Sequence, residues 1–214
     1  MMNRRTLTQS AAALAAAAWL PWHTAALAAE EAPDALVKRL SADVLESIKS
    51  GDVDKIIALV DKTIMPHVNF RRMTAAAVGP AWRKATPEQQ KRLQDEFKQL
   101  LVRTYSGALN QVSDQSIVVK PLRAAPGDTD VLVRTEVIGR GDPVQLDYRL
   151  EKSPGADGGW KIYNLNVLGV WLVETYRSQF AQEVNAKGVD GLIAALAARN
   201  KANAEGTTGV AGTK

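Results

Sequence analysis

Residues able to carry acid–base, nucleophilic or metal chemistry are scarce in this sequence. There is no cysteine, and of the two histidines only His67 lies outside an N-terminal leader. One imidazole without thiols supplies too few ligands for a typical zinc or copper site. A Ser-His-Asp triad would need His67, and the chain has no G-x-S-x-G sequence, phosphate loop or dinucleotide fingerprint. We therefore expect no enzyme, no metal and no cofactor, and we interpret His67 as a helix-end histidine near unpaired carbonyls.

The charged residues are typical of solvated helix faces. The basic pairs are scattered along the chain, as Lys38-Arg39, Arg71-Arg72, Arg83-Lys84 and Lys91-Arg92. Two of the 27 Lys and Arg and none of the 23 acids lie in the leader, so removing it leaves a net charge of +2. We therefore expect no nucleic-acid partner, although one basic pair could face a phospholipid headgroup or an acidic partner surface.

The first 29 residues have the pattern of a secretory signal peptide. Arg4 and Arg5 precede the apolar residues 11–20, and small residues at 26–29 suit cleavage. We expect a mature protein that starts near Ala29 or Glu30, exported by either the general or the twin-arginine route. No later apolar run approaches the length of a membrane span, so we expect the mature protein to be soluble.

The hydrophobic periodicity of the sequence predicts an α+β fold with one four-stranded sheet. Apolar stripes at helical spacing predict helices over residues 34–48, 52–65, 70–78 and 87–112. Asn69 is expected to cap the third of these helices, and Thr86 and Gln89 to form a capping box at the start of the fourth. Alternation predicts strands over 117–122, 130–138, 144–151 and 159–167, joined by turn-rich links and therefore antiparallel. Helices follow from Gly169 to about Val184 and over 190–200, and we expect a disordered tail from Ala204. Residues 30–203 form one predicted domain, a curved meander wrapped by N-terminal and C-terminal helices.

One face of this sheet is predicted to be apolar. Counting alternate residues along each strand places Tyr163, Leu165 and Val167 together, with Trp160 and Ile162 on the other side. Two helices are expected to face the same apolar surface. The wall predicted in this way contains Leu101, Tyr105, Val131, Val133, Val144, Leu146, Tyr148, Leu150, Tyr163, Leu165, Val167, Tyr176 and Phe180. On composition alone such a face favours a filled core, because apolar sheet faces are normally core.

Several segments in order resemble the MlaC family, the periplasmic phospholipid-binding proteins also known as toluene-tolerance proteins. The first half carries FRRM at 70–73, GPAWRKATPEQ at 79–89 and LLVRTY at 100–105. The second half carries DYRL at 147–150, GWKIY at 159–163, YRSQF at 176–180 and GVDGLI at 188–193. The resemblance covers residues 34–200. Two positions depart from its pattern: Trp171 replaces a small polar residue, and Asn164 stands where Asp is common.

The resemblance implies a periplasmic carrier that holds a diacyl phospholipid in an apolar cavity. It implies exchange with an outer-membrane lipoprotein–porin complex and with an inner-membrane ABC transporter that has MCE-domain subunits. The resemblance thus favours a chamber over a filled core. We expect a monomer, because the regular alternation leaves no second large apolar face. Helical spacing places Trp171 on the polar side of its helix, where it is either a local packing residue, which is favoured, or a contact at the cavity mouth or partner surface.

Two alternatives from other functional classes remain at this point. One is a periplasmic enzyme on a cone-shaped α+β fold, with His67 and Asp147 as its only candidate groups, although Asp147 is expected to face outward. The other is an interaction protein that binds no ligand.

Overall fold

The computed structural model describes residues 31–48, 58–109, 115–139, 141–153 and 159–205. Its longer helices are α1 (Pro33–Ile48), α3 (Phe70–Val78), α4 (Pro87–Leu109) and α5 (Leu172–Ala204). Shorter helical turns are η1 (Val60–Ile64), η2 (Met65–His67) and η3 (Gly79–Lys84). The leader, the start of the helix expected from residue 52, the end of the helix expected to reach residue 112, and residues 206–214 lie outside the described part. None of the described helices is both long and apolar enough to cross a membrane.

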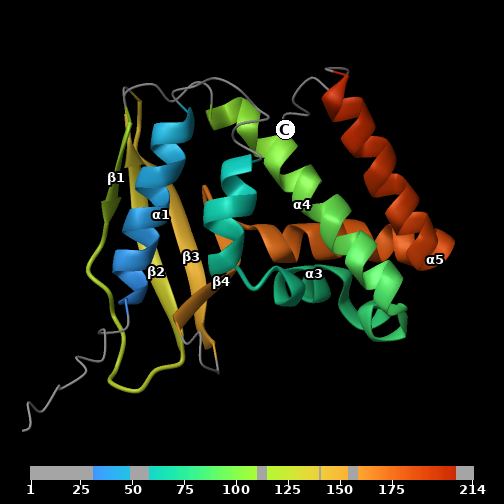
Figure 1. Cartoon of the computed structure of the whole chain (residues 1–214), viewed down its shortest axis with the longest axis horizontal. Helices are drawn as coiled ribbons and strands as arrows, with labels where there is room; N and C mark the ends of the chain where they lie inside the picture. Colours follow the sequence, from blue (N-terminus) through green and yellow to red (C-terminus); the bar gives the residue numbers. More distant parts are fainter. Residues whose placement is uncertain (1–30, 49–57, 110–114, 140, 154–158, 206–214) are drawn as a thin grey trace, which may run out of the picture.

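The sheet confirms the predicted antiparallel meander. Its strands are β1 (Ser116–Val119), β2 (Asp130–Ile138), β3 (Val144–Ser153), β4 (Gly159–Val167) and β5 (Val170–Trp171), and their order in the sheet follows the chain. The two-residue strand β5 was not predicted, because the change of period at Gly169 indicated that the helix starts there. Instead the chain first turns back and pairs Trp171 with Asn166. Helix α1 and a layer made of α3, α4 and α5 flank this sheet (Figure 1).

A β-bulge interrupts the pairing of β3 with β4. Tyr148 lies opposite Leu165, but Leu150 lies opposite Ile162, so β4 carries one extra residue. An extra residue reverses which side chains share a face beyond it, because the side-chain period of a strand is two. Trp160 and Ile162 therefore share the face of Leu165, and the prediction that placed Tyr163 on this face is wrong.

The predicted helix starts are confirmed by their caps. The Asn69 side chain accepts a hydrogen bond of 3.0 Å from the Arg72 backbone N–H at the start of α3. Thr86 and Gln89 form the expected capping box of α4. The Gln89 N–H donates to the Thr86 hydroxyl at 3.2 Å, and the Thr86 N–H donates to the Gln89 side chain at 3.0 Å. These local bonds satisfy backbone donors that the helices leave free.

Helix α5 consists of two arms that meet at Gly188. Gly188 has φ 70° and ψ −170°, a conformation outside the helical region that only glycine adopts readily. The second arm matches the helix predicted over 190–200 and returns along α4, where the Asn200 amide donates to the Glu96 carbonyl at 2.9 Å. The kink thus lets the two arms of α5 run in different directions within the helical layer (Figure 1).

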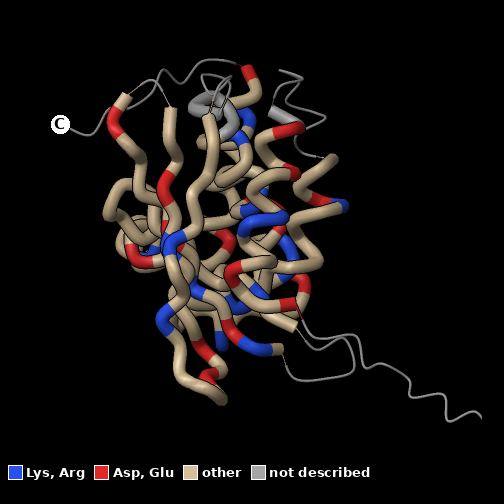
Figure 2. Tube along the Cα trace, turned by 90° about the vertical axis from the view of Figure 1, so that its left-hand side faces the viewer, with Lys and Arg blue, Asp and Glu red and all other residues tan. Residues whose placement is uncertain are grey.

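Two hydrophobic clusters hold the fold together. In the first, which we call the α1 cluster, Leu36, Val37 and Leu40 pack on buried sheet residues. In the second, the aromatic cluster, Phe97 lies between Phe70, Tyr176 and Phe180, with ring centroids 5.0 to 5.7 Å apart. Charges of both signs are interspersed over the side of the molecule drawn in Figure 2.

Candidate functional site

The inner face of the sheet is divided along its strands into a filled part and an open part. At the filled part, Val131, Val133 and Leu150 are 5%, 1% and 0% exposed, and they belong to the α1 cluster. The predicted wall residues here are therefore ordinary core. Side chains so completely covered have almost no surface left for a ligand.

The open part lies toward the other end of the same strands. The register places Leu146 opposite Val167 and Tyr148 opposite Leu165, and these four side chains share one face. All four, and Val144 beside them, are only partly buried. Among the described residues, Val144 and Leu146 belong to neither core cluster. Partly exposed aliphatic side chains on an inner sheet face provide apolar surface that a ligand can cover.

Helix α4 contributes Leu101 and Tyr105 to this region. Both are partly buried and pack against the aromatic cluster, as do Leu165 and Val167 from β4. Predicted residues from a strand and from a helix at least sixty positions earlier in the chain thus pack against one cluster. We call Leu101, Tyr105, Val144, Leu146, Tyr148, Leu165 and Val167 the open apolar site.

Tyr176 and Phe180 lie behind the open apolar site rather than in it. They are 4% and 3% exposed, and each packs edge-on against Phe97, at 5.0 and 5.1 Å between ring centroids. Two buried aromatic rings in this arrangement stabilise the helical layer. The two side chains therefore expose too little surface for the ligand contact that the sequence predicted.

The open apolar site carries two tyrosine hydroxyls and no charged side chain. Burial raises the pKa of Tyr105 to about 12, and the neighbouring Tyr176 adds to the rise. Burial also raises the pKa of Tyr148 to about 12, although a hydrogen bond with Ser41 of α1 acts in the opposite direction. Both phenols stay protonated at neutral pH, so the site is apolar and uncharged, and its hydroxyls can serve as hydrogen-bond donors.

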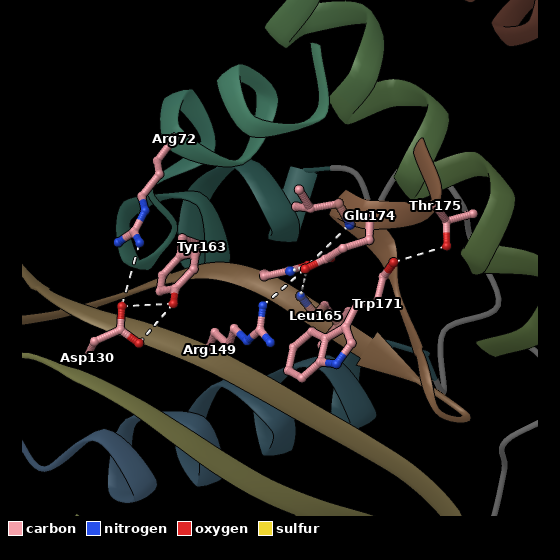
Figure 3. A network of polar contacts seen from close by, with 10 residues as sticks. Arg72, Asp130, Arg149, Tyr163, Leu165, Trp171, Glu174 and Thr175 are labelled. Carbon is pink, nitrogen blue, oxygen red and sulfur yellow. Dashed lines mark hydrogen bonds and ion pairs between the residues drawn. The ribbon is translucent and has the colours of Figure 1, made fainter. Parts of the chain in front are cut away.

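Tyr163 belongs to a polar network on the opposite face of the sheet (Figure 3). Its hydroxyl donates to the two Asp130 carboxylate oxygens at 2.9 and 2.8 Å, and the Arg72 guanidinium lies 3.5 Å from the centre of its ring. Arg72 also pairs with Glu151. Tyr163 was predicted to line the cavity, and the bulge turns it away.

Trp171 and Asn164, the two departures from the family pattern, lie in the same network. Trp171 is not on a helix face but at the N-cap position of α5, and the Arg149 guanidinium lies 4.0 Å from the centre of its ring. Asn164 is 2% exposed; its side-chain oxygen accepts from the Val173 N–H at 3.2 Å, and its amide donates to Glu174 at 2.8 Å. The ring of Trp171 thus contacts Arg149 locally and is itself only partly buried.

Asn164 had no detectable role in the sequence. It anchors the first turn of α5 from a strand, eight positions before that helix begins. A cap that comes from another element leaves no local spacing signal, so sequence reasoning missed it. Ser41, Trp160 and Ile162 were missed for similar reasons, because their contacts depend on how α1 and the bulged strand are placed.

The candidate groups for an enzyme do not come together. Asp147 lies opposite Asn166 on β4. Val68, the residue after His67, bridges to Ile162 on the same strand. Ile162 and Asn166 are four residues apart, which is about 13 Å along the strand. Asp147 is 3% exposed, which corrects the expectation that it faces outward. It accepts hydrogen bonds from the Thr135 N–H and the Gln145 amide.

His67 lies in a cationic and partly buried setting. Burial lowers the pKa of His67, and Arg39 and Lys161 lower it further. The Arg39 Nη2 atom is 3.5 Å from the His67 Nε2 atom. In the described ranges no group of three or more His, Asp or Glu side chains is arranged to hold a metal ion.

Comparison with known proteins relates most of the described part of the chain to one family. The family model described as MlaC protein matches residues 33–198. A phospholipid-binding protein from Ralstonia solanacearum, solved in complex with a phospholipid, is 48% identical. It has a TM-score of 0.75, and the match covers 80% of this chain and 98% of that chain.

Two sequence relatives agree with this match. The toluene tolerance protein Ttg2D of Pseudomonas putida is 37% identical over 109 residues, which span 50% of this chain and only about half, 49%, of that protein. The intermembrane phospholipid transport system binding protein MlaC of Haemophilus influenzae is 22% identical over 77% of this chain and 80% of that protein.

Proposed function

The chain belongs to the MlaC family, and from this membership we propose that it is a periplasmic carrier that binds a diacyl phospholipid and moves it through water between two membranes. The acyl chains lie against the open apolar site. The single observation that carries this proposal is the likeness to a Ralstonia solanacearum protein solved with a phospholipid, at 48% identity and over 98% of that chain.

The physical chemistry of the open apolar site supports the same proposal. Each methylene exposed to water during transport costs about 0.8 kcal/mol, so a carrier must cover its cargo with apolar side chains. Leu101, Val144, Leu146, Leu165 and Val167 offer such side chains, partly exposed and free of charge. Val131, Val133 and Leu150, by contrast, serve the fold and contribute no wall.

The cellular setting is part of the proposal. The leader at residues 1–29 supports export, and the family supports exchange with an inner-membrane ABC transporter that has MCE-domain subunits and with an outer-membrane lipoprotein–porin complex. The carrier acts as a monomer, because its apolar surface is used for the cargo.

Solvent extraction tests the proposal directly. Full-length protein is produced with its leader, purified from the periplasm without detergent, and extracted for lipid mass spectrometry. We expect close to one phospholipid per chain, and N-terminal sequencing should start near residue 29 or 30. Purified protein that holds no lipid, and takes up none from phospholipid vesicles, would contradict the carrier function.

A further inference from the structure

The hairpin between β4 and β5 has an unfavourable local conformation. Val167 pairs with Val170, which leaves Leu168 and Gly169 as a two-residue turn. Their φ angles are 53° and 84°, the pattern of a type I′ turn, in which Asn-Gly is the preferred sequence. Leu168 is the one non-glycine residue with a positive φ in the part of the chain that the structure describes. A leucine in this conformation is sterically disfavoured.

The same turn exposes apolar surface. Leu168 is 67% exposed and Val170 is 51% exposed, and the third large hydrophobic side chain exposed in the described ranges is Val118, at 44%. Two unfavourable features therefore coincide at the residues 168–170, which we call the hairpin tip. Backbone strain and exposed apolar surface do not stabilise the isolated fold. Their coincidence therefore indicates that the hairpin tip contacts another molecule.

The hairpin tip is held in a defined shape. The Leu168 N–H donates to the Gln145 carbonyl at 3.0 Å, and the Gly169 N–H donates to the Asn166 side chain at 2.9 Å. Behind it, Trp171 stacks on Arg149 and starts α5 (Figure 3). Apolar side chains presented on such a rigid support lose little conformational entropy on binding.

The hairpin tip also adjoins the open apolar site. Val167 is the residue before Leu168, and it pairs with Leu146 on one side and Val170 on the other. A partner that contacts the tip is therefore placed next to the proposed cargo.

We propose that the hairpin tip is a docking element that seats in an apolar pocket on a membrane-embedded lipid-transport protein when the carrier receives or delivers its cargo. This inference rests on the proposed carrier function. As the partner of the hairpin tip, a pocket on a protein is favoured over the lipid bilayer itself. Leu168 and Val170 offer about seven side-chain carbons, about half of a myristoyl chain, which alone holds a protein on a bilayer only marginally. The net charge is +4 for the full chain and +2 without residues 1–29, and charges of both signs are interspersed, so the attraction to anionic lipid is weak.

Lipid transfer tests this docking role. Carrier loaded with fluorescent phospholipid is mixed with phosphatidylethanolamine–phosphatidylglycerol vesicles that contain the inner-membrane complex of the transport system, or with the same vesicles free of protein. Leu168→Asn and Val170→Asn should slow transfer to the complex about tenfold, the effect of losing one well-buried contact. Lipid content and transfer to protein-free vesicles should stay unchanged.

The chain offers a matched control. Val118→Asn makes the same change at an exposed valine of the opposite edge strand, β1, and should alter none of these rates. Leu168→Asn should also unfold at the same temperature as the wild type or higher, because Asn tolerates this backbone conformation.

Three results for Leu168→Asn and Val170→Asn would overturn the docking proposal. The first is unchanged transfer to the complex. The second is equal slowing with protein-free vesicles, which would indicate that the tip contacts the bilayer, and the third is loss of bound lipid, which would place the tip in the cargo site. A wild type without lipid would refute the carrier function instead. Co-sedimentation with the complex-containing vesicles would then decide docking, since wild type should bind and Leu168→Asn should not. Equal binding of both would refute docking.

Discussion

At the scale of the residue, Leu146 and Leu150 show how different two leucines of one strand can be. They lie on the same face of β3, four positions apart. Leu150 is fully buried in the α1 cluster, whereas Leu146 is partly exposed and belongs to neither core cluster. Their substitution therefore separates a role in the fold from a role in cargo binding.

Leu146→Glu should keep cooperative urea unfolding with a modest loss of stability and should lose the co-purified phospholipid. Leu150→Glu should fail to fold, because an unpaired buried carboxylate costs several kcal/mol. Leu132→Glu is the control, since Leu132 alternates with Val131 and Val133 and lies opposite Arg149; it should fold and keep its lipid. A Leu146→Glu protein with full lipid occupancy would show that this residue does not contact the cargo.

Asn164 is a second residue with a specific prediction. Asn164→Ala removes the cap of α5 and the hydrogen bond to Glu174, so it should lower the free energy of unfolding by about 1–2 kcal/mol. Asn164→Asp keeps the acceptor for the Val173 N–H but places a second carboxylate against Glu174, so it should lose at least as much stability as Asn164→Ala. Urea unfolding of the three proteins measures this order, and an Ala variant as stable as the wild type would mean that the cap contributes nothing.

At the scale of the element, α5 depends on the conformation of one glycine. Gly188 at φ 70° redirects the chain so that Leu192, Ile193 and Leu196 of the second arm join the aromatic cluster. A Cβ at this position would meet nothing within 4 Å, so the requirement for glycine comes from the backbone alone.

Gly188→Ala should therefore destabilise the protein by about 1–3 kcal/mol without any steric clash. Gly141→Ala is the matched control: it also has open space around the added Cβ, but its φ is not positive. It should change stability by no more than about 0.5 kcal/mol. Thermal unfolding of both variants gives the comparison, and equal melting temperatures would argue that α5 bends freely at this point.

At the scale of the whole molecule, stability should depend on alkaline pH through two partly buried tyrosines. Tyr105 and Tyr148 have pKa values of about 12 in the folded protein, above the value of about 10 in an unfolded chain. Between these values the folded state binds more protons than the unfolded state, so stability falls as pH rises. The stabilising contribution is complete below about pH 10 and is lost toward pH 12.

Urea unfolding at several pH values from 9 to 12 checks this dependence. The free energy of unfolding should decrease more steeply for the wild type than for Tyr148→Phe, because phenylalanine does not titrate. If both proteins show the same slope, the phenol of Tyr148 is not shielded from water in the folded state.

The periodic features of this protein could be predicted from its amino-acid sequence. Helix caps at Asn69 and Thr86, the strands of the meander and the α+β class all follow from local spacing, because caps and alternation act between residues close in the chain. The motifs also indicated the family, because their order and spacing are properties of the chain alone. Local rules thus accounted for which elements form and in which order they occur.

Which part of the apolar face is covered could not be predicted from the sequence, because it depends on how distant elements pack. Burial of Leu150 depends on where α1 lies, and the orientation of Tyr163 depends on a bulge that exists only once β3 and β4 pair. Asp147 is buried although its alternation indicated the outside, and β5 forms because Trp171 finds a partner in Asn166. Periodicity assigns a side chain to a face, but contacts between elements distant in the chain determine whether that face is filled, open or turned away.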